Sequence, residues 1–360
     1  MISIAQKDRI QNSLLRWFKR NARDLPWRRT KDPYAIWISE IMLQQTQVPT
    51  VIPYYRKFLK TFPTVRRLAK ADLSDVLTVW EGLGYYARAR NLHQAARKIL
   101  TRFEGKIPGA LDDLLSLPGI GRYTAGAILS IAYNKETPIL DGNVKRVLSR
   151  LFAISENPAD VKTGKLLWKI SESLIPKGHA GSFNQALMDL GSMVCTPNAP
   201  LCPDCPTVSF CKAKTQGNPE SYPIRQVRKK IPHIYAAAAV IRRDQKVLIT
   251  QRPPEGLLGG LWEFPNWEMD GGGDLQKQLK IRIKRELGIR VKGNELLGSF
   301  KQTFSHFKLS LSVYRFQVLD GRGRGKWVFG QKLHQFPMSR LHRKIAKSLS
   351  PGLELRRLNS

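Results

Sequence analysis

The spacing of apolar residues divides the chain into a helical part and a part rich in strands. From Gln6 to about Ala213, apolar residues recur at three- and four-residue intervals, which is the period of an amphipathic helix. Gly and Pro residues separate these segments and mark turns between them. The predicted helices include an N-terminal one within residues 1–20, followed by residues 34–47, 50–62, 85–103, 123–133, 144–152 and 164–174.

The pattern changes after residue 215. Residues 216–232 hold several prolines and a run of basic residues, a composition typical of a linker. Beyond them, short segments of β-like composition predict strands, interrupted by one helix at residues 275–287. The predicted strands are residues 235–241, 246–251, 295–303, 308–319 and 325–329. We therefore expect an all-α domain at residues 1–215 and an α+β domain at residues 233–360.

The net charge indicates a polyanionic partner. The chain has 60 Lys and Arg residues against 28 Asp and Glu residues, for a net charge of +32. Nucleic acid and an anionic membrane are the two candidates. No apolar run reaches the length of a membrane span, and the short N-terminus has no secretory or targeting pattern. We therefore expect a DNA-binding protein of the bacterial cytoplasm that has no membrane partner.

All four cysteines lie in one loop at residues 195–211, with the spacing Cys-x6-Cys-x2-Cys-x5-Cys. In a reducing compartment this clustering favours a metal site over disulfides. Four thiolates can hold a zinc ion or a [4Fe-4S] cluster, and composition alone leaves both open. Zinc ribbons usually have two separated CxxC knuckles, whereas this loop is compact. The candidate ligands are Cys195, Cys202, Cys205 and Cys211.

Residues 110–131 contain the string Leu-Pro-Gly-Ile-Gly, followed by small residues in a predicted helix. Gly119 and Gly121 allow backbone amides to point outward at the start of that helix, where they can bind an anion such as a DNA phosphate. An ordinary pair of packed helices is the simpler alternative. The string and the small residues together favour a helix-hairpin-helix that binds DNA.

Two acidic residues have surroundings suited to breaking an N-glycosidic bond. That reaction needs an acid to protonate the departing base and a carboxylate to face the sugar cation. Glu40 lies among Ile, Met and Leu residues, where burial would raise its pKa, although it could instead be exposed on an amphipathic helix. Asp141 precedes a predicted helix, where a capping role is the simpler alternative.

Taken together, these motifs resemble the endonuclease III superfamily of DNA glycosylases, and within it the adenine glycosylases. Besides the cysteine loop, the strings SEIMLQQTQV, GLGYYARARNLH, LPGIGRYTAGAI, LDGNVKRVLSR and FNQALMDLGSMVC carry the resemblance in this order. The resemblance implies that the cysteine loop binds a [4Fe-4S] cluster. It also implies a monomeric enzyme whose partner is double-stranded DNA with adenine opposite 8-oxoguanine or guanine.

The resemblance also implies roles for individual residues. Glu40 would protonate a flipped-out adenine, and Asp141 would stabilise the sugar cation. Bifunctional members of the superfamily have a lysine where this chain has Tyr123, so no β-elimination through a lysine is expected. The remaining assignments are Tyr123 and Asn143 as partners of Asp141; Arg28, Leu43 and Gln185 in the adenine pocket; Gln45 and Tyr85 as residues that enter the duplex; and Gly119, Gly121 and Lys145 as DNA contacts.

Residues 259–265 and 285–289 resemble parts of a Nudix (MutT-like) domain. Nudix hydrolases hold a divalent metal with several glutamates on one helix, but the helix predicted at residues 275–287 carries lysines and arginines instead. We therefore expect a recognition domain. Its predicted tip is the string Phe304, Ser305 and His306, which resembles a loop that reads 8-oxoguanine.

Four functional hypotheses follow, led by a monofunctional adenine glycosylase. The second is a bifunctional glycosylase and AP lyase, which Tyr123 disfavours. The third is a nucleotide hydrolase, which the basic helix in the second domain disfavours. The fourth is a non-catalytic DNA-binding protein, in which Glu40 and Asp141 would be incidental.

Overall fold

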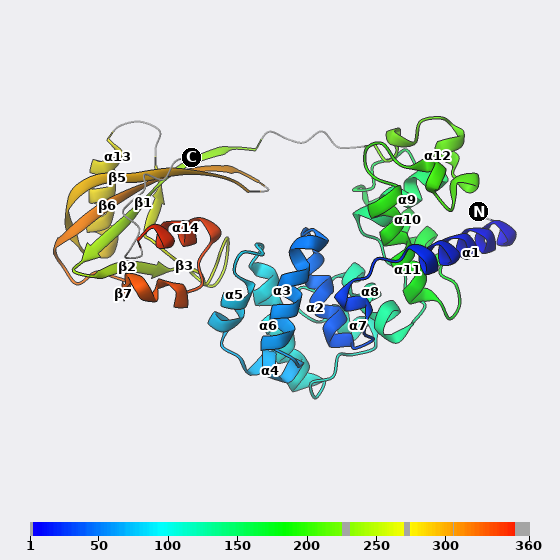
Figure 1. Ribbon diagram of the computed structural model, residues 1–360, viewed down its shortest axis with the longest axis horizontal. Coiled ribbons are helices and arrows are strands. Elements are labelled where there is room, and N and C mark those ends of the chain that lie inside the picture. Colours follow the sequence, from blue (N-terminus) through cyan, green and yellow to red (C-terminus); the bar gives the residue numbers. More distant parts are fainter. Residues whose placement is uncertain (1–2, 225–230, 270–273, 305, 350–360) are drawn as a thin grey trace. The chain divides into compact units, whose positions relative to one another are not determined.

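The computed structural model describes residues 3–224, 231–269, 274–304 and 306–349. Contacts between residues divide the chain into two compact units, one made of residues 1–70 and 91–228 and the other of residues 71–90 and 229–360. Helices build the first unit, and the second contains the β-sheet (Figure 1). The predicted order of an all-α region followed by an α+β region is therefore confirmed.

Helices account for the chain up to residue 224, and α6 spans both units. The α-helices are α1 (Ile4–Asn21), α2 (Pro33–Leu43), α3 (Val48–Thr61), α4 (Val65–Lys70), α5 (Leu73–Trp80), α6 (Ala87–Arg102), α7 (Leu111–Leu115), α8 (Arg122–Tyr133), α9 (Gly142–Phe152), α10 (Val161–Ser173), α11 (Ala180–Asp189) and α12 (Lys212–Thr215). Shorter helical turns are η1 (Pro26–Arg28), η2 (Leu190–Val194), η3 (Cys202–Asp204), η4 (Val208–Phe210) and η5 (Pro219–Ser221). None of the helices in the described ranges is both long and apolar enough to span a membrane.

Several helices begin or end a few residues from the predicted positions, and two of these differences have a cause in the backbone. The helix expected at residues 34–47 ends at Leu43, and the helix expected to start at residue 85 starts at Ala87. The cause is the backbone of Gln45 (φ 57°) and Tyr85 (φ 48°), because a left-handed φ breaks a right-handed helix. Hydrophobic spacing does not report such a conformation in a residue other than glycine.

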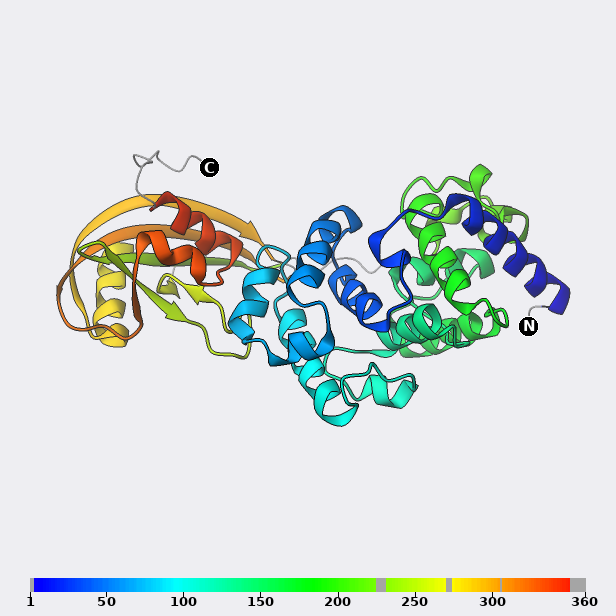
Figure 2. The same cartoon turned by 60° about the horizontal axis from the view of Figure 1, so that its bottom comes forward.

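The core of the first unit forms where α1 packs on α11. Ile10 and Leu14 of α1 are fully buried in one cluster with Phe183 and Leu187 of α11. The two helices lie side by side in Figure 2, where α1 is dark blue and α11 green. Val144 and the following apolar positions of α9 join the same cluster, so this core fixes the helix that Asp141 precedes.

Helix α8 lies at the centre of the first unit and depends on two glycines. Gly119, in the turn between α7 and α8, has a φ of +77°, and a Cβ there would lie 2.8 Å from the Cβ of Asn91. Within α8, a Cβ on Gly126 would lie 2.3 Å from the carbonyl oxygen of Pro138. Only glycine therefore allows α8 to approach the segment that leads to Asp141.

The second unit contains a seven-stranded sheet in which the path β3-β2-β1-β6-β5 is extended by β4 beside β1 and β7 beside β2. Strands β1 and β6 are parallel, and the other pairs are antiparallel. The elements are β1 (His233–Arg243), β2 (Lys246–Gln251), β3 (Trp262–Glu263), β4 (Asn266–Glu268), α13 (Leu275–Arg282), η6 (Ile283–Leu287), β5 (Arg290–Thr303), β6 (Lys308–Asp320), β7 (Lys326–Phe329), η7 (Gly330–Gln335) and α14 (Arg340–Ser348). All five predicted strands are present.

Each face of this sheet is covered by a helix, because strand side chains alternate between faces. In β1, Ala236 and Ala238 pack in the cluster that contains α14, whereas Ala237 and Ala239 pack in the cluster that contains α13. Alanine at all four positions lets both helices lie close to the strand. The segment at residues 71–90 belongs to this unit, where Glu81 forms an ion pair with Arg343 of α14 at 2.5 Å.

Candidate active site

A small cavity of about 50 Å³ brings together five residues that the sequence assigned to the site. Its volume suits only one or two water molecules, so the surrounding side chains must shift to admit a base. Its lining includes Arg28, Glu40, Leu43, Tyr123, Gln185 and Met188, which come from η1, α2, α8 and α11.

Glu40 lies on α2, whose apolar sequence is buried over most of its length. The side chain is 4 % exposed, and its Oε2 atom has no hydrogen-bond partner among the described residues. Burial raises the pKa of Glu40 to about 7, and the charge of Asp141 acts in the same direction. Tyr123 and Arg28 act against this shift. Glu40 is therefore a carboxylic acid that can hold a proton near neutral pH and release it within the cavity.

Asp141 is the residue before α9, and its carboxylate accepts a hydrogen bond from the backbone N–H of Val144 at 2.7 Å. The side-chain amide of Asn143 donates a second bond at 3.1 Å. Burial nevertheless raises the pKa of Asp141 above its ordinary value. Asp141 therefore caps α9, and its charge also contributes to the raised pKa of Glu40.

Tyr123 is the second residue of α8, and its hydroxyl lies 3.2 Å from the sulfur of Met188. Burial raises the pKa of the phenol well above its ordinary value, and the charges of Glu40 and Asp141 add to the shift. The hydroxyl therefore stays protonated and serves as a hydrogen-bond donor between two carboxyl groups. A phenol cannot form an imine, so it cannot replace a lysine nucleophile.

The sequence analysis did not identify three residues of the site, which are Arg23, Met188 and Asp189. Met188 lines the cavity. Asp189 is fully buried at the end of α11, where it forms ion pairs with Arg23 and with Arg28. Asp189 is the only acid in the string FNQALMDLGSMVC. The reasoning that identified Glu40, an acid among apolar neighbours, would have identified Asp189 as well.

The cysteine loop packs against the same core as the cavity, and Cys195, Cys205 and Cys211 contact that core. Burial raises the pKa of Cys205 and Cys211, and the charges of the other thiols, Cys202 included, add to this. The four thiols therefore converge, and as thiolates they need positive charge from a bound group. Among the described residues, no group of three or more His, Cys, Asp or Glu side chains is arranged to hold a single metal ion. Four cysteine thiolates form a donor set that fits an iron–sulfur cluster and also a zinc ion.

Two arginines of α9 connect this loop to the site. The buried guanidinium of Arg150 donates to the carbonyl oxygens of Thr196 at 2.6 Å and Pro197 at 3.0 Å. Arg146 donates to the carbonyl of Cys195 at 2.7 Å and to the side chain of Asn143 at 2.8 Å. Both arginines turn toward the loop, where they donate hydrogen bonds to its backbone carbonyl groups.

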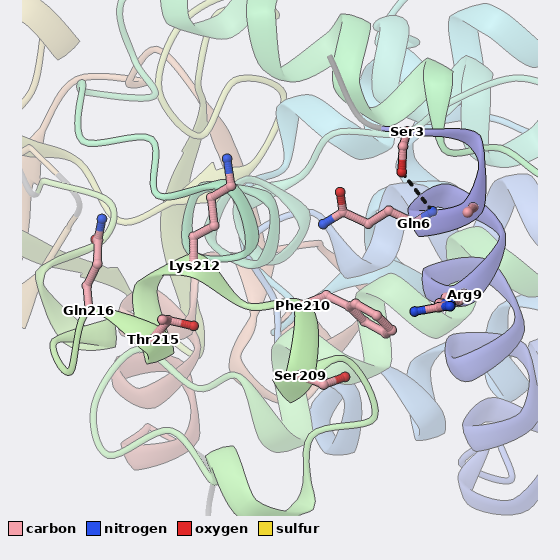
Figure 3. A pocket seen from close by; sticks show the side chains of 9 residues that line it. Ser3, Gln6, Arg9, Ser209, Phe210, Lys212, Thr215 and Gln216 are labelled. Atoms are coloured by element: carbon pink, nitrogen blue, oxygen red, sulfur yellow. Dashed lines mark hydrogen bonds between the residues drawn. The ribbon is translucent and has the colours of Figure 1, made fainter.

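A larger cavity of about 620 Å³ lies between the start of α1 and the segment around α12 (Figure 3). Arg9 and Lys212 make it cationic, and Ser3 accepts a hydrogen bond from the backbone N–H of Gln6 at 3.2 Å. No carboxylate is found among its described lining residues, so it lacks the acid that base removal requires. The smaller cavity at Glu40 is therefore the candidate active site.

The remaining predicted residues lie outside the cavity lining. Gln45 is exposed, and Tyr85 is 46 % exposed, each with the left-handed backbone described above. Lys145 donates to the carbonyl of Pro158 at 3.3 Å. In the hairpin between β5 and β6, Phe304 stacks on Phe307 with ring centroids 4.5 Å apart, and His306 packs beside the same ring at 5.1 Å. Ser305 lies outside the described residues.

The glutamate of the second unit that would belong to a Nudix metal site is fully occupied. Glu286, in η6, accepts hydrogen bonds from Trp267 at 2.5 Å, Arg282 at 3.0 Å and Arg285 at 2.9 Å. These donors hold the pKa of Glu286 below its ordinary value. The predicted absence of a glutamate cluster therefore has a structural counterpart, because arginines hold the one glutamate that remains.

Comparisons with known proteins agree with both halves of this description. Residues 38–173 match the HhH-GPD superfamily of base excision DNA repair proteins, and residues 236–348 match the NUDIX domain. A thermostable thymine-DNA glycosylase of known structure superposes with a TM-score of 0.55 at 30% identity, covering 59% of this chain and 98% of that one. An endonuclease III–DNA complex superposes with a TM-score of 0.51 at 21% identity, covering 60% of this chain and 99% of the other, which supports the helical fold alone.

Relatives match over nearly the whole chain. The adenine DNA glycosylase of Homo sapiens is 34% identical, over 95% of this chain and 74% of the relative. The adenine DNA glycosylase of Buchnera aphidicola is 39% identical, over 83% of this chain and 84% of the relative. With a site built on Glu40 and Asp141 and this degree of identity, the chain belongs to the adenine DNA glycosylase family of base excision repair proteins.

Proposed function

We propose that this protein is a monofunctional, monomeric adenine DNA glycosylase that excises adenine paired with 8-oxoguanine or guanine in double-stranded DNA. The observation that carries the proposal is the buried acid Glu40 in the cavity lining, with Tyr123 in the same lining and the charge of Asp141 near enough to raise the pKa of Glu40. A protonated acid and a fixed carboxylate are what removal of a purine base requires.

Glu40 acts as the general acid. A base flipped into the cavity meets a carboxyl group whose pKa of about 7 keeps much of it protonated near neutral pH. Transfer of that proton to a ring nitrogen of adenine makes the base a neutral leaving group. The apolar part of the lining, which includes Ile36, Leu43 and Met188, limits the access of water to this proton.

Asp141 faces the sugar from which the base departs. Its carboxylate is fixed by Val144 and Asn143 before the reaction, so the negative charge that stabilises the sugar cation needs no reorganisation. Water then completes hydrolysis at the sugar carbon. Because Tyr123 cannot form an imine, the product is an intact strand with an abasic site.

The exposed left-handed residues suit contact with a duplex. Gln45 and Tyr85 each hold a conformation that costs energy for a residue other than glycine, and such conformations concentrate at functional sites. A side chain inserted between base pairs offsets the unstacking that base flipping requires. Gly119, Gly121 and Lys145 would contact phosphates, consistent with a net charge of +32.

Cys195, Cys202, Cys205 and Cys211 would hold a [4Fe-4S] cluster. When bound, the cluster supplies positive charge to the thiolates and stabilises the loop, and no step of base removal passes through it. The second unit would read the base opposite adenine through the hairpin of Phe304, Ser305 and His306. A hydroxyl there can accept the hydrogen that guanine gains at N7 on oxidation.

The test is a single-turnover assay on a labelled duplex with adenine opposite 8-oxoguanine. We expect adenine release, with strand scission only after alkali, and a loss of at least about 10³-fold in rate for Glu40→Gln, within the range for a general acid. Glu172→Gln is the matched control, because Glu172 lies exposed on α10. Scission without alkali would indicate the bifunctional alternative, and full activity of Glu40→Gln would exclude the mechanism.

A second experiment separates chemistry from recognition. Truncation near residue 225 removes β1 through α14 and should leave adenine excision measurable, with a smaller preference for 8-oxoguanine over guanine. The comparison uses the ratio of excision rates on the two duplexes, for the truncated and full chains. An unchanged ratio would contradict the role proposed for Phe304, Ser305 and His306.

A further inference from the structure

A buried ion cluster adjoins the cavity, and both of its arginines, Arg23 and Arg28, are among the lining residues. Asp189, at the end of α11, is fully buried, and its Oδ1 atom accepts hydrogen bonds from Nε of Arg23 at 2.8 Å and from Nη2 of the same residue at 2.5 Å. Its Oδ2 atom accepts a bond from Nη1 of Arg28 at 2.6 Å. One carboxylate therefore joins two arginines, of which only Arg28 has a previously assigned place in the site.

Arg28 is held in three ways. Besides the bond to Asp189, its Nη1 donates to the backbone carbonyl of Arg23 at 3.1 Å. Its guanidinium also lies over the ring of Phe18, 5.2 Å from the centroid. A flexible side chain is thus fixed by an ion pair, a backbone bond and an aromatic ring, and it is only 13 % exposed.

The same bonds leave the other side of the guanidinium available. Arginine has five N–H donors, and Nη1 uses both of its hydrogens on Asp189 and Arg23. The Nε donor and the two Nη2 donors have no partner among the residues that the structure describes. Because Arg28 lines the cavity with Glu40, these three donors are the ones that a purine with acceptor nitrogens can use.

We propose that Asp189 and Arg23 are positioning residues that hold the guanidinium of Arg28 in the base pocket. The inference rests on the proposed function, because Arg28 acts there on the flipped base. Arg23 fixes the Asp189 carboxylate so that one oxygen faces Arg28, and its own backbone carbonyl holds Arg28 a second time. Asp189 is not among the residues that line the cavity, whereas Arg23 does line it, so the role proposed for Arg23 is its bond to Asp189 and not a contact with the base.

The ion cluster also explains why an acid is tolerated at this depth. An isolated buried carboxylate is costly, but Asp189 has two cationic partners and uses both of its oxygens. The cluster keeps one net positive charge, and that charge lies on the side of the cavity, where Arg28 acts on Glu40. A role limited to packing would not need three charges at this position.

The test is a double-mutant cycle on single-turnover adenine excision by the full chain. We expect Arg28→Gln and Asp189→Asn each to slow excision about 100-fold, because a small misplacement of a contacting group has effects of that order. If Asp189 acts through Arg28, the double variant is also about 100-fold slower, rather than about 10⁴-fold. Additive losses would overturn the inference.

Arg23→Gln keeps the test decisive if Asp189→Asn does not fold. This variant retains the Asp189–Arg28 pair but frees the carboxylate to rotate, so we expect about a 10-fold slower rate and partial recovery in Arg23→Lys. The matched control is Arg29→Gln. Arg29 follows Arg23 closely in the sequence, but its ion pair with Asp24 is exposed to solvent. Thermal unfolding of each variant checks that the fraction folded is unchanged at the assay temperature.

The outcomes separate this inference from the proposed function. If the parent protein releases no adenine, or Glu40→Gln keeps full activity, the proposed function fails. If the parent releases adenine and Arg28→Gln is impaired, but Arg23→Gln and Asp189→Asn excise at the parent rate, only the positioning role fails. An Arg29→Gln variant as slow as Arg23→Gln would also overturn it, because loss of any local ion pair would then suffice.

Discussion

The two units treat acidic side chains in opposite ways. In the helical unit, Glu40 is buried with one oxygen unpaired, and its pKa rises to about 7. In the sheet unit, Glu286 is surrounded by two arginines and a tryptophan N–H, and its pKa falls. The first arrangement retains a proton that can be transferred, and the second retains only a structural anion.

The difference shows that the donors around a glutamate, more than its position in a family motif, decide its chemistry. Glu286 occupies the Nudix-like string of residues 285–289, yet all its contacts are with donors of its own unit. Glu40 has fewer such donors, because Tyr123 and Arg28 oppose the effect of burial only in part and the Oε2 atom has no partner among the described residues. The following predictions test this contrast, from the largest expected effect to the smallest.

After Glu40→Gln, the largest effect is expected from replacing Asp141, the carboxylate proposed to face the sugar. We expect Asp141→Asn to slow single-turnover excision about 10²–10³-fold, the usual cost of losing one fixed electrostatic group at a transition state. Asparagine is also a good helix cap, so α9 should remain folded. The measurement is adenine release from the 8-oxoguanine duplex at saturating protein.

Asp274→Asn is the matched control for that variant. Asp274 also caps a helix, α13, by accepting hydrogen bonds from the backbone N–H groups of Gln276 and Lys277. Its replacement should leave the excision rate unchanged. If Asp141→Asn were no slower than this control, Asp141 would be a capping residue only, and the contrast between the units would lose its second catalytic group.

The raised pKa of Glu40 predicts that both the excision rate and the stability of the protein fall as pH rises, over different pH ranges. Excision should fall about tenfold per pH unit above about pH 7, because the general acid must be protonated. The folded pKa lies above the unfolded one, so the folded state binds more protons and loses stability as pH rises from about 4.5 to about 7. A shift of this size corresponds to about 3 kcal/mol.

Glu40→Gln removes that destabilisation. The variant should therefore unfold at a higher denaturant concentration than the parent at pH 8, by a free energy of up to about 3 kcal/mol, and should match the parent near pH 4.5. Glu172→Gln should show no such pH-dependent gain. Equal stability of Glu40→Gln and the parent at pH 8 would mean that Glu40 ionises without cost in the folded protein.

In the sheet unit, Glu263 depends on one arginine. It accepts a hydrogen bond from Arg252 at 2.8 Å and lies 3.8 Å from Nε2 of His342, whose pKa burial lowers to about 3. Arg252→Gln should leave a buried carboxylate without its cation and destabilise this unit by about 1–3 kcal/mol. The measurement is the shift of the unfolding midpoint.

Arg290→Gln is the control for this variant, because it breaks an ion pair with Asp320 that is exposed to solvent. Exposed pairs contribute little, so its midpoint should move less. Adenine excision should persist in both variants at temperatures where they are folded. A larger shift for Arg290→Gln would show that the sheet unit does not depend on its buried pairs.

The sequence predicted much of this molecule because its helices and strands follow regular hydrophobic periods. The six interior helices and five strands lie close to their expected positions. The errors occur where hydrophobic periodicity carries no information. Gln45 and Tyr85 have a left-handed φ, which is incompatible with a right-handed helix at these residues. Strands β3 and β4 are too short to show a pattern.

The site was only partly predictable for a related reason. Glu40 and Asp141 are conspicuous because an acid in an apolar or helix-capping context invites explanation. Other parts of the site depend on contacts between distant segments of the chain. Asp189, for example, is hydrogen-bonded to Arg23, which lies 166 positions away in the sequence. The inward turn of Arg146 and Arg150 is likewise decided by a loop some 45 residues away.

Loss of the occupied glutamate should give the smallest effect. Glu286→Gln removes an anion whose hydrogen-bond partners, among the described residues, are Trp267, Arg282 and Arg285, so excision and any preference for 8-oxoguanine should stay at the parent values. Neither the parent nor Glu286→Gln should release phosphate or pyrophosphate from 8-oxo-dGTP with Mg²⁺, because the two arginines occupy one carboxylate oxygen and Trp267 occupies the other. Magnesium-dependent hydrolysis that disappears in Glu286→Gln would show that a cation competes with those arginines. In that case Glu286 would be reactive as Glu40 is, and the contrast between the two units would fail at the residue that defines it.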